Sequence, residues 1–227
     1  MKQKPTPTCI GIILDGNRRW AKKVGLPKLE GHRRGYERLI DCARWVRDRD
    51  IKHLAVFAFS IENWNREATE VAYLMDLLMK MAKKTLLELA KEGVRIRFIG
   101  KLDMLSESAR KTIAAVEKQS ENNKRLTLWI CLSYGARAEI AAAAKEVAKS
   151  GEEITEESLR KHFWSRDMPD PDMIIRTGNE QRLSNFLLWQ AAYSELFFID
   201  TLWPDFSEAE LDRVLEEYSH RERRMGR

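Results

Sequence analysis

Short apolar runs alternate along the chain with longer stretches in which apolar residues recur every three or four positions. A short apolar run is typical of a buried strand, and the longer periodic stretch is typical of an amphipathic helix. Strands are predicted at residues 10–14, 53–59, 94–99, 126–132, 173–175 and 196–199. Helices are predicted at residues 33–49, 71–92, 106–122, 136–149, 155–163, 184–194 and 207–221. This alternation indicates an α/β fold with a central, mostly parallel six-stranded sheet flanked by helices.

No repeat, low-complexity tract or linker rich in Pro or Gly interrupts this pattern. Ser207 with Glu210 forms a capping-box pattern before the last predicted helix, and Thr155 with Ser158 marks another helix start. A chain of 227 residues is long enough to bury a hydrophobic core. We therefore expect residues 1–227 to form a single domain.

The predicted helix at 71–92 is apolar around most of its circumference, with many Leu and Met residues. Such a helix is most often part of the buried core. Because Met and Leu adapt to flexible chains, it could also form one wall of an elongated lipid-binding cleft. The sequence favours the core interpretation.

The formal net charge of +5 suits nucleic acid, an anionic membrane surface or a phosphorylated small substrate. Most basic residues alternate with acidic residues along the predicted helices, and only the tail at 220–227 concentrates them. No RNA-binding aromatic motif or zinc-finger spacing is present. We therefore expect no nucleic-acid partner.

The apolar runs are too short for a membrane-spanning helix, which needs about 18 consecutive apolar residues. The first run ends at Asp15 and is also too short for a signal peptide. Cys9, Cys42 and Cys131 lie far apart in apolar contexts, so they are expected to be reduced core residues. These features predict a cytoplasmic protein.

The first apolar run ends abruptly at a polar sequence, Asp15-Gly16-Asn17-Arg18-Arg19-Trp20. Gly16 permits a tight turn, and the N–H groups that follow can bind an anion at a helix N-terminus. Arg18 and Arg19 suit phosphate oxygens, and Asp15 suits a cation such as Mg²⁺. The residues predict a diphosphate site with its metal, although an ordinary strand–turn–helix junction explains them equally well on local grounds.

Three further polar clusters adjoin other predicted strands. They are Ser60-Ile61-Glu62-Asn63-Trp64-Asn65-Arg66 after the strand at 53–59, Arg176-Thr177-Gly178-Asn179-Glu180-Gln181-Arg182-Leu183-Ser184 after the strand at 173–175, and Glu195 beside the strand at 196–199. Open α/β sheets bind their ligands at the carboxyl ends of the strands. We therefore expect all four clusters to share one edge of the sheet.

The cluster from Arg176 to Ser184 has the chemistry of a second diphosphate cradle. Arg176 and Arg182 flank a glycine-containing loop, and Ser184 is predicted to start a helix whose free N–H groups can bind an oxyanion. Asp15 and Glu195 supply two carboxylates for a divalent metal. Two phosphate sites, a metal and much apolar surface suit an enzyme that joins two amphiphilic diphosphates.

Several motifs, spread along nearly the whole chain, resemble those of a known protein family and occur in the same order. They are Asp-Gly-Asn-Arg-Arg-Trp at 15–20, Gly31-His32, Ala58-Phe59-Ser60, Glu62 to Arg66, Arg176-Thr177-Gly178, Arg182 to Gln190, Tyr193 to Leu196, and Trp203-Pro204-Asp205-Phe206. In these motifs the chain resembles the cis-prenyltransferase family, with undecaprenyl-diphosphate synthase as the most similar type. The resemblance implies elongation of an allylic prenyl diphosphate by isopentenyl diphosphate with formation of cis double bonds, giving a lipid-carrier precursor when the product is long. It also implies a hydrophobic tunnel, a homodimer and peripheral contact with membranes through the lipid product.

The resemblance assigns roles by position. Asp15 and Glu195 would hold Mg²⁺, and Asp15 and Asn63 would be catalytic. The allylic diphosphate would be bound by Gly16, Asn17, Arg18, Arg19, Trp20, Lys28, His32 and Arg66, with Ser60, Ile61, Glu62 and Trp64 nearby. Isopentenyl diphosphate would be bound by Arg176, Arg182, Leu183 and Ser184, and Arg224, in an Arg224-Met225-Gly226 tail, would reach a neighbouring active site across the dimer.

Some positions depart from the family pattern or leave alternatives open. Lys28 replaces a frequent Arg and keeps the charge without the bidentate fork, and Glu67 stands where Pro is usual.

Two roles leave alternatives open. An amide is a poor base, so Asp15 or a diphosphate oxygen suits the role of proton acceptor better than Asn63. Trp129 either closes the far end of the tunnel or simply packs.

Two other function classes are considered. A catalytically silent partner subunit of the same fold is expected to lack the Asp or the terminal Arg-x-Gly, and this chain has both. A nucleotide-binding protein or other phosphate enzyme is expected to carry a Walker loop or a Gly-x-Gly-x-x-Gly loop, and the sequence has neither.

Overall fold

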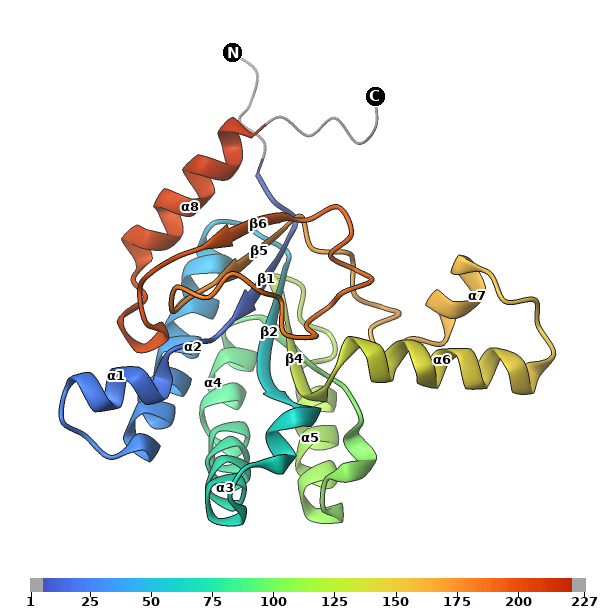
Figure 1. Ribbon diagram of the computed structural model, residues 1–227, viewed down its shortest axis with the longest axis horizontal. Coiled ribbons are helices and arrows are strands. Elements are labelled where there is room, and N and C mark those ends of the chain that lie inside the picture. The colour runs from blue at the N-terminus through green and yellow to red at the C-terminus, as the bar shows by residue number, and fades with distance from the viewer. Residues whose placement is uncertain (1–5, 222–227) are drawn as a thin grey trace.

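The computed structural model describes residues 6–221, which form an α/β fold around one six-stranded sheet (Figure 1). The strands are β1 Cys9–Ile13, β2 His53–Ser60, β3 Val94–Ile99, β4 Leu126–Tyr134, β5 Met173–Arg176 and β6 Glu195–Phe198. Their order in the sheet is β3-β4-β2-β1-β5-β6, and every neighbouring pair is parallel. All six predicted strands are confirmed, and the sheet is wholly rather than mostly parallel.

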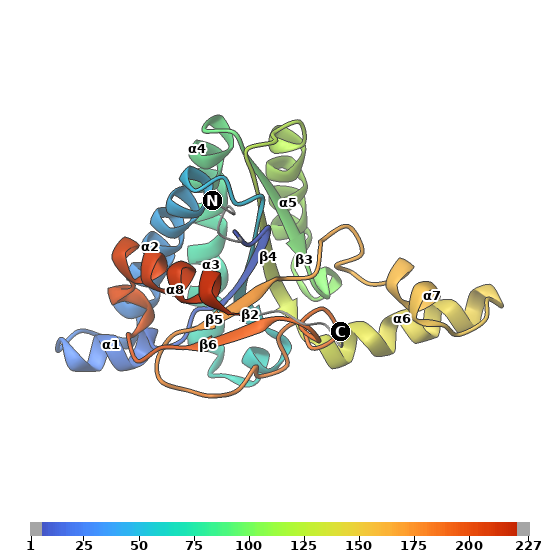
Figure 2. The ribbon, with the colours of Figure 1, turned by 90° about the horizontal axis from the view of Figure 1, so that it is seen from above.

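The helices cover this sheet unevenly. They are α1 Asn17–Lys23, α2 Lys28–Asp48, α3 Ala68–Lys83, α4 Thr85–Lys91, α5 Glu107–Ser120, α6 Ala136–Ser150, α7 Glu156–Lys161 and α8 Glu208–His220, with 3-10 turns η1 Ile61–Asn65, η2 Leu102–Met104 and η3 Trp203–Asp205. Side chains of α2–α5 and α8 pack with one face of the strands into the main core. The α6 and α7 helices project away from the rest of the molecule (Figures 1 and 2).

Two helix predictions need correction. The predicted helix at 71–92 begins earlier and breaks at Lys84, which separates α3 from α4. The predicted helix at 184–194 does not form, because Ser184, Asn185 and Leu187 have left-handed backbone conformations with φ of 50°, 68° and 45°. Consecutive L-residues cannot continue a right-handed helix in that conformation. Phe186 and Leu187 instead bury their side chains against the second face of the sheet.

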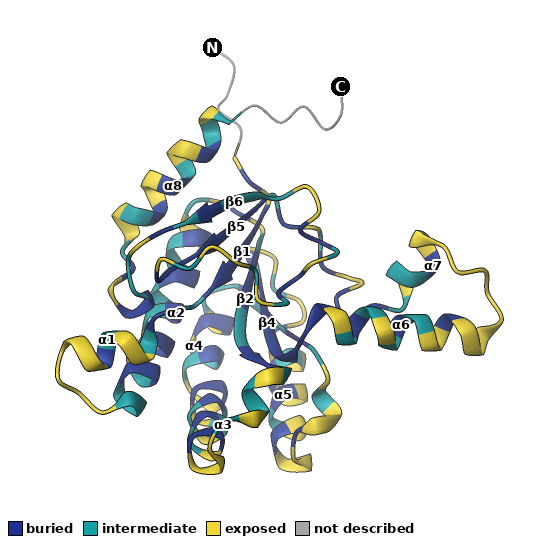
Figure 3. Ribbon diagram, in the orientation of Figure 1, coloured by how far each residue is buried: buried dark blue, intermediate teal, exposed yellow. Residues whose placement is uncertain are grey.

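The core interpretation of the apolar stretch on α3 is confirmed. Leu74, Leu78 and Met81 are buried in the main core cluster. Most strand residues are buried and dark blue in Figure 3, whereas the outer faces of the helices are exposed. Trp129 packs on the opposite face of the sheet and donates from Nε1 to Nδ1 of His53 at 3.2 Å. Trp129 therefore does not close a tunnel between the sheet and α2 or α3.

Two glycines on α2 allow α1 to lie very close to it. A Cβ atom on Gly31 would lie 2.1 Å from the backbone oxygen of Asn17, and one on Gly35 would lie 2.2 Å from Oδ1 of Asn17. The buried Trp203 donates from Nε1 to the Gly35 oxygen at 2.7 Å on the same helix. The first residues after Asp15 are thereby held against α2.

This contact predicts different effects for the two glycines. Gly31→Ala and Gly35→Ala should each lower the free energy of unfolding by about 1–3 kcal/mol through overpacking, measured by urea denaturation. Since Gly35 meets the side chain of Asn17, Asn17→Ala should restore much of the stability of Gly35→Ala. It should not restore that of Gly31→Ala, whose clash is with the backbone. Equal behaviour of the two double variants would contradict this packing.

Candidate active site

Three of the four predicted clusters meet at one edge of the sheet. Asp15 follows β1, Ser60 ends β2, and Arg176 ends β5. These strands are neighbours in the order β2-β1-β5 and run in parallel, so their carboxyl ends lie side by side. Ligand sites of open α/β sheets lie at this position.

The fourth cluster lies elsewhere. Glu195 begins β6 and is level with Met173, the first residue of β5, so it lies at the amino-terminal edge of the sheet. There its carboxylate accepts a hydrogen bond from Nη1 of Arg221 at 2.8 Å. The expectation that Glu195 shares an edge with Asp15 is wrong, because the residue precedes its strand rather than following it. The two carboxylates do not form one metal site within this chain.

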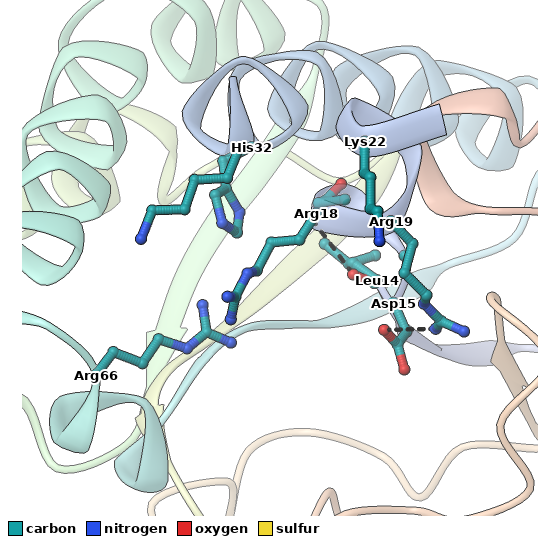
Figure 4. Close-up of a pocket in the computed structure, with 10 residues that line it drawn as sticks. Leu14, Asp15, Arg18, Arg19, Lys22, His32 and Arg66 are labelled. Atoms are coloured by element: carbon teal, nitrogen blue, oxygen red, sulfur yellow. Dashed lines mark hydrogen bonds and ion pairs between the residues drawn. The ribbon is translucent and has the colours of Figure 1, made fainter. Parts of the chain in front are cut away.

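The first pocket, of about 610 Å³, lies between α1, the start of α2 and the end of η1. It is lined by Leu14, Asp15, Gly16, Asn17, Arg18, Arg19, Lys22, Lys28, His32 and Arg66. Arg18 and Arg66 extend toward one another beside His32 (Figure 4). Like charges that face each other across a pocket repel, and an anion between them relieves that repulsion. The first pocket therefore has the electrostatics of a phosphate site.

Glu70 organises these cations and was missed from the sequence. Its carboxylate, only 3 % exposed, lies 3.2 Å from Nη1 of Arg66 and 3.2 Å from Nζ of Lys28. Burial alone raises the pKa of Glu70, but its hydrogen bond from Lys28 and the nearby arginine charges outweigh burial and lower the pKa. The i,i+4 spacing of Arg66 and Glu70 was the available signal. Lys28 also contacts Glu67 at 2.9 Å, so two of the departures from the family pattern pair with each other.

His32 presents an unpaired nitrogen to the pocket. Its Nε2 atom is buried and lies 3.5 Å from Oε1 of Glu70 without forming a hydrogen bond. Burial, followed by the charge of Arg66, lowers the pKa of His32 to about 4. His32 is therefore neutral at neutral pH, and its ring can donate a hydrogen bond to a phosphate oxygen.

Asp15 connects the first pocket to the end of β5. Its carboxylate accepts from Nη2 of Arg19 at 3.1 Å and from Nη2 of Arg176 at 2.7 Å. Arg176 is buried and also donates to Oγ of Ser184 at 2.8 Å and to the backbone oxygen of Arg182. A buried guanidinium with three acceptors is fixed in place.

The donor set at Asp15 fits Mg²⁺. Within residues 6–221, no group of three His, Cys, Asp or Glu side chains could hold a metal ion by itself. Mg²⁺ is commonly bound by one or two carboxylates together with waters and substrate phosphates. Asp15 is partly exposed at the rim of a pocket that suits phosphate, so it can provide that single carboxylate.

A second pocket, of about 580 Å³, adjoins the first on the other side of Asp15 and Arg66. It is lined by Ile13, Leu14, Asp15, Phe57, Ser60, Glu62, Asn63, Arg66, Arg137, Arg176, Ser184 and Asn185. Asp15 and Arg66 line both pockets. Two anions bound in them would therefore lie side by side.

The structure places the Ser60–Trp64 segment firmly. Oγ of Ser60 accepts from the Asn63 N–H at 3.3 Å, and Oδ1 of Asn63 accepts from the Ser60 N–H at 3.1 Å. Trp64 donates from Nε1 to Oγ of Ser133 at 3.0 Å and packs edge-on against Phe59. The Asn63 amide is held by this capping box at the wall of the second pocket.

Several other predicted site residues lie outside both pockets. Trp20 donates to Oδ1 of Asp205 at 2.6 Å, and the exposed Arg182 pairs with Glu180. Leu183 packs in the second core cluster, and Ile61 and Trp64 line neither pocket. Ser184 lines the second pocket and accepts from Nη1 of Arg176, but it does not start the predicted helix. The predicted role of Arg224 lies outside the described residues.

A smaller cavity of about 100 Å³ lies between β2 and α2 and shares lining residues with both pockets. Its walls include Leu14, Tyr36, Phe57, Phe59, Leu74 and Trp203, and Asn17, His32, Asn63 and Arg66 form its polar rim. The expected hydrophobic tunnel stays a prediction. No helix in residues 6–221 is long and apolar enough to cross a membrane.

Comparison with known proteins agrees with this geometry. Residues 13–226 match the family described as "Putative undecaprenyl diphosphate synthase". An isoprenyl transferase of Thermotoga maritima is 46% identical over 225 residues, covering 97% of each chain. An isoprenyl transferase of Neisseria gonorrhoeae is 44% identical, covering 97% of this chain and 90% of its own.

Two solved structures share the fold. Lavandulyl diphosphate synthase from Lavandula x intermedia, in complex with dimethylallyl diphosphate, superimposes with a TM-score of 0.94 at 33% identity and covers 98% of this chain and 99% of its own. A probable undecaprenyl diphosphate synthase from Campylobacter jejuni gives a TM-score of 0.84 at 33% identity, covering 98% of this chain and 100% of its own. The chain therefore belongs to the undecaprenyl diphosphate synthase family of prenyltransferases.

Proposed function

We propose that the chain condenses isopentenyl diphosphate with an allylic prenyl diphosphate to give a cis-polyprenyl diphosphate of the undecaprenyl type. The observation that carries the proposal is the pair of cationic pockets that share Asp15 and Arg66 and that both adjoin a smaller cavity lined partly by apolar side chains. The first pocket would bind the allylic diphosphate, whose hydrocarbon would enter the cavity. The second pocket would bind isopentenyl diphosphate.

The described residues suit this reaction. When the allylic carbon–oxygen bond breaks, negative charge develops on the departing diphosphate, and Arg18, Arg19 and Arg66 can stabilise it. The allylic carbon bonds to the terminal alkene carbon of isopentenyl diphosphate, whose C2 then loses a proton. Two adjoining pockets hold the reacting carbons in a fixed orientation. Mg²⁺, when bound at Asp15, would supply Lewis-acid neutralisation of the diphosphate charge.

The capping box supports a positioning role for Asn63. Its amide oxygen already accepts a backbone N–H, which leaves the side chain fixed at the pocket wall. The Asp15 carboxylate is already engaged by hydrogen bonds from Arg19 and Arg176. An oxygen of the departing diphosphate, adjacent to both pockets, is the acceptor that we propose for the C2 proton.

A short product is the second candidate. The open cavity of about 100 Å³ is small beside the 300–1,000 Å³ typical of small-molecule pockets. Long products require that the side chains around Leu74 on α3 move apart.

We further propose that the enzyme is a homodimer that contacts membranes peripherally through its lipid product. The edge strand β6 and the exposed side chains of Leu188 and Tyr193 support an interface on that side of the sheet. Light scattering coupled to size exclusion would measure the mass of the assembly, and flotation with liposomes would measure membrane contact.

The function is tested by incubation with radiolabelled isopentenyl diphosphate and allylic primers of graded length, followed by chromatography. We expect label in products longer than the primer, with hydrolysed products giving the chain length. Omission of the primer is the control. No incorporation with any primer in the presence of Mg²⁺ would overturn the proposal.

Asp15→Asn should reduce turnover by at least about a hundredfold, because the carboxylate that holds the metal is lost. The amide oxygen can still accept from Arg176, so circular dichroism should show an unchanged fold, whereas loss of the ion pair with the buried Arg176 should lower the melting temperature. Asp76→Asn, at an exposed position paired with Lys80 on α3, is the matched control. Turnover of Asp15→Asn close to that of the control would refute the assigned role.

The lowered pKa of His32 predicts a pH-dependent stability. The unfolded chain takes up a proton on this ring below about pH 6.5, whereas the folded chain does so only near pH 4. The folded state should therefore lose stability, by up to about 3 kcal/mol, as pH falls from 6.5 to 4. Urea denaturation at several pH values should show that His32→Gln loses less free energy of unfolding than the unaltered protein between pH 6.5 and 4. Equal losses in the two proteins would contradict the lowered pKa of His32.

A further inference from the structure

Arg137 is an uncommitted cation at the wall of the second pocket. It lies in the first turn of α6, its side chain is exposed, and it lines that pocket together with Arg66 and Arg176. Within residues 6–221, the Arg137 guanidinium has neither a hydrogen-bond nor an ion-pair partner. Arg66 and Arg176, by contrast, contact Glu70 and Asp15.

The backbone of Arg137 is nevertheless held in place. Its N–H donates to Oδ1 of Asn185 at 2.9 Å, and the N–H of Ala136 donates to the Asn185 backbone oxygen at 2.9 Å. Asn185 adopts a left-handed conformation with a φ of 68°. A Cβ atom on Gly135 would lie 2.7 Å from Nδ2 of Asn185, so a side chain at this position would displace the Asn185 amide. The start of α6 is thereby joined to the loop after β5, which also contacts η1 through the hydrogen bond from Asn185 to Glu62.

The charges that face the second pocket leave Arg137 available for an anion. Two carboxylates line it, and Asp15 is already engaged by two arginines. The other, Glu62, accepts from Nδ2 of Asn185 at 2.8 Å. Burial raises the pKa of Glu62, but its hydrogen bonds and the nearby charge of Arg137 outweigh burial and lower it. Arg137 thus acts on Glu62 through space while its five donors stay free.

We propose that Arg137 is a further binding residue that contacts the diphosphate of isopentenyl diphosphate in the second pocket and determines its KM. The inference rests on the function proposed above. A guanidinium suits this role because its planar fork can bind two phosphate oxygens at once. Because Arg137 lines the second pocket together with Arg66 and Arg176, it adds donors that neither Glu70 nor Asp15 engages.

The test is steady-state kinetics of Arg137→Gln and Arg137→Lys, with each substrate varied in turn. Loss of a charge-assisted contact should raise the KM for isopentenyl diphosphate at least about tenfold in Arg137→Gln. The kcat and the KM for the allylic diphosphate should stay within about twofold, and Arg137→Lys should recover part of the loss. Arg213→Gln, at an exposed position on α8, is the matched control. Unchanged KM values, or equal increases for both substrates, would overturn the proposal.

An indirect action through Glu62 is separated by a double-mutant cycle. If Arg137 only neutralised Glu62, Arg137→Gln would have no effect in the Glu62→Gln background, and that result would overturn the proposal. We expect the increase in KM to persist there.

Calorimetric titration with isopentenyl diphosphate gives a readout that does not depend on turnover. Weaker binding by Arg137→Gln than by the unaltered protein supports the contact, and equal binding overturns it. If the unaltered protein shows no turnover with any primer, the proposed function fails instead. The titration does not depend on turnover, so it distinguishes that failure from failure of the Arg137 proposal.

Discussion

The ion pair between Asp15 and Arg176 is the interaction on which the arrangement of the site depends. It joins the ends of β1 and β5, and its arginine is only 4 % exposed. A buried guanidinium is costly unless it is paired and hydrogen-bonded, and Arg176 meets that requirement with Asp15, Ser184 and a backbone oxygen. Because the same Asp15 carboxylate borders both pockets, the pair fixes the wall between them.

The other acidic residues of the site allow several cationic side chains to lie close together before a ligand binds. Glu70 compensates Arg66 and Lys28 from within the protein, so their side chains are positioned before an anion arrives. Such preorganised donors need not be reoriented during the reaction. Lys28 pairs with Glu67 as well, so the two substitutions relative to the family pattern compensate each other in charge.

Much of the fold could be predicted from the sequence, because a parallel sheet buried on both faces produces short apolar runs that polar turns terminate. All six strands and the clusters after β1, β2 and β5 were located in this way. The helix expected at 184–194 failed because apolar residues at irregular spacing there cover the second face of the sheet as a loop. Glu195 was assigned to the wrong edge of the sheet. It is the first residue of β6, so it lies at the amino-terminal edge, whereas Asp15 follows its strand and lies at the carboxyl-terminal edge.

The sequence by itself determined the chemistry available: the strand-end motif at Asp15–Trp20, the basic residues suited to phosphate, and the membership of a prenyltransferase family that those motifs indicate. Only the tertiary structure decided which of these groups meet. Glu70 and Arg137 enter the site from helices far along the chain, while Arg182 and Glu195 turn to other partners. The physical reason is that local sequence fixes a residue's charge and secondary structure, whereas strand order, helix packing and burial fix its neighbours.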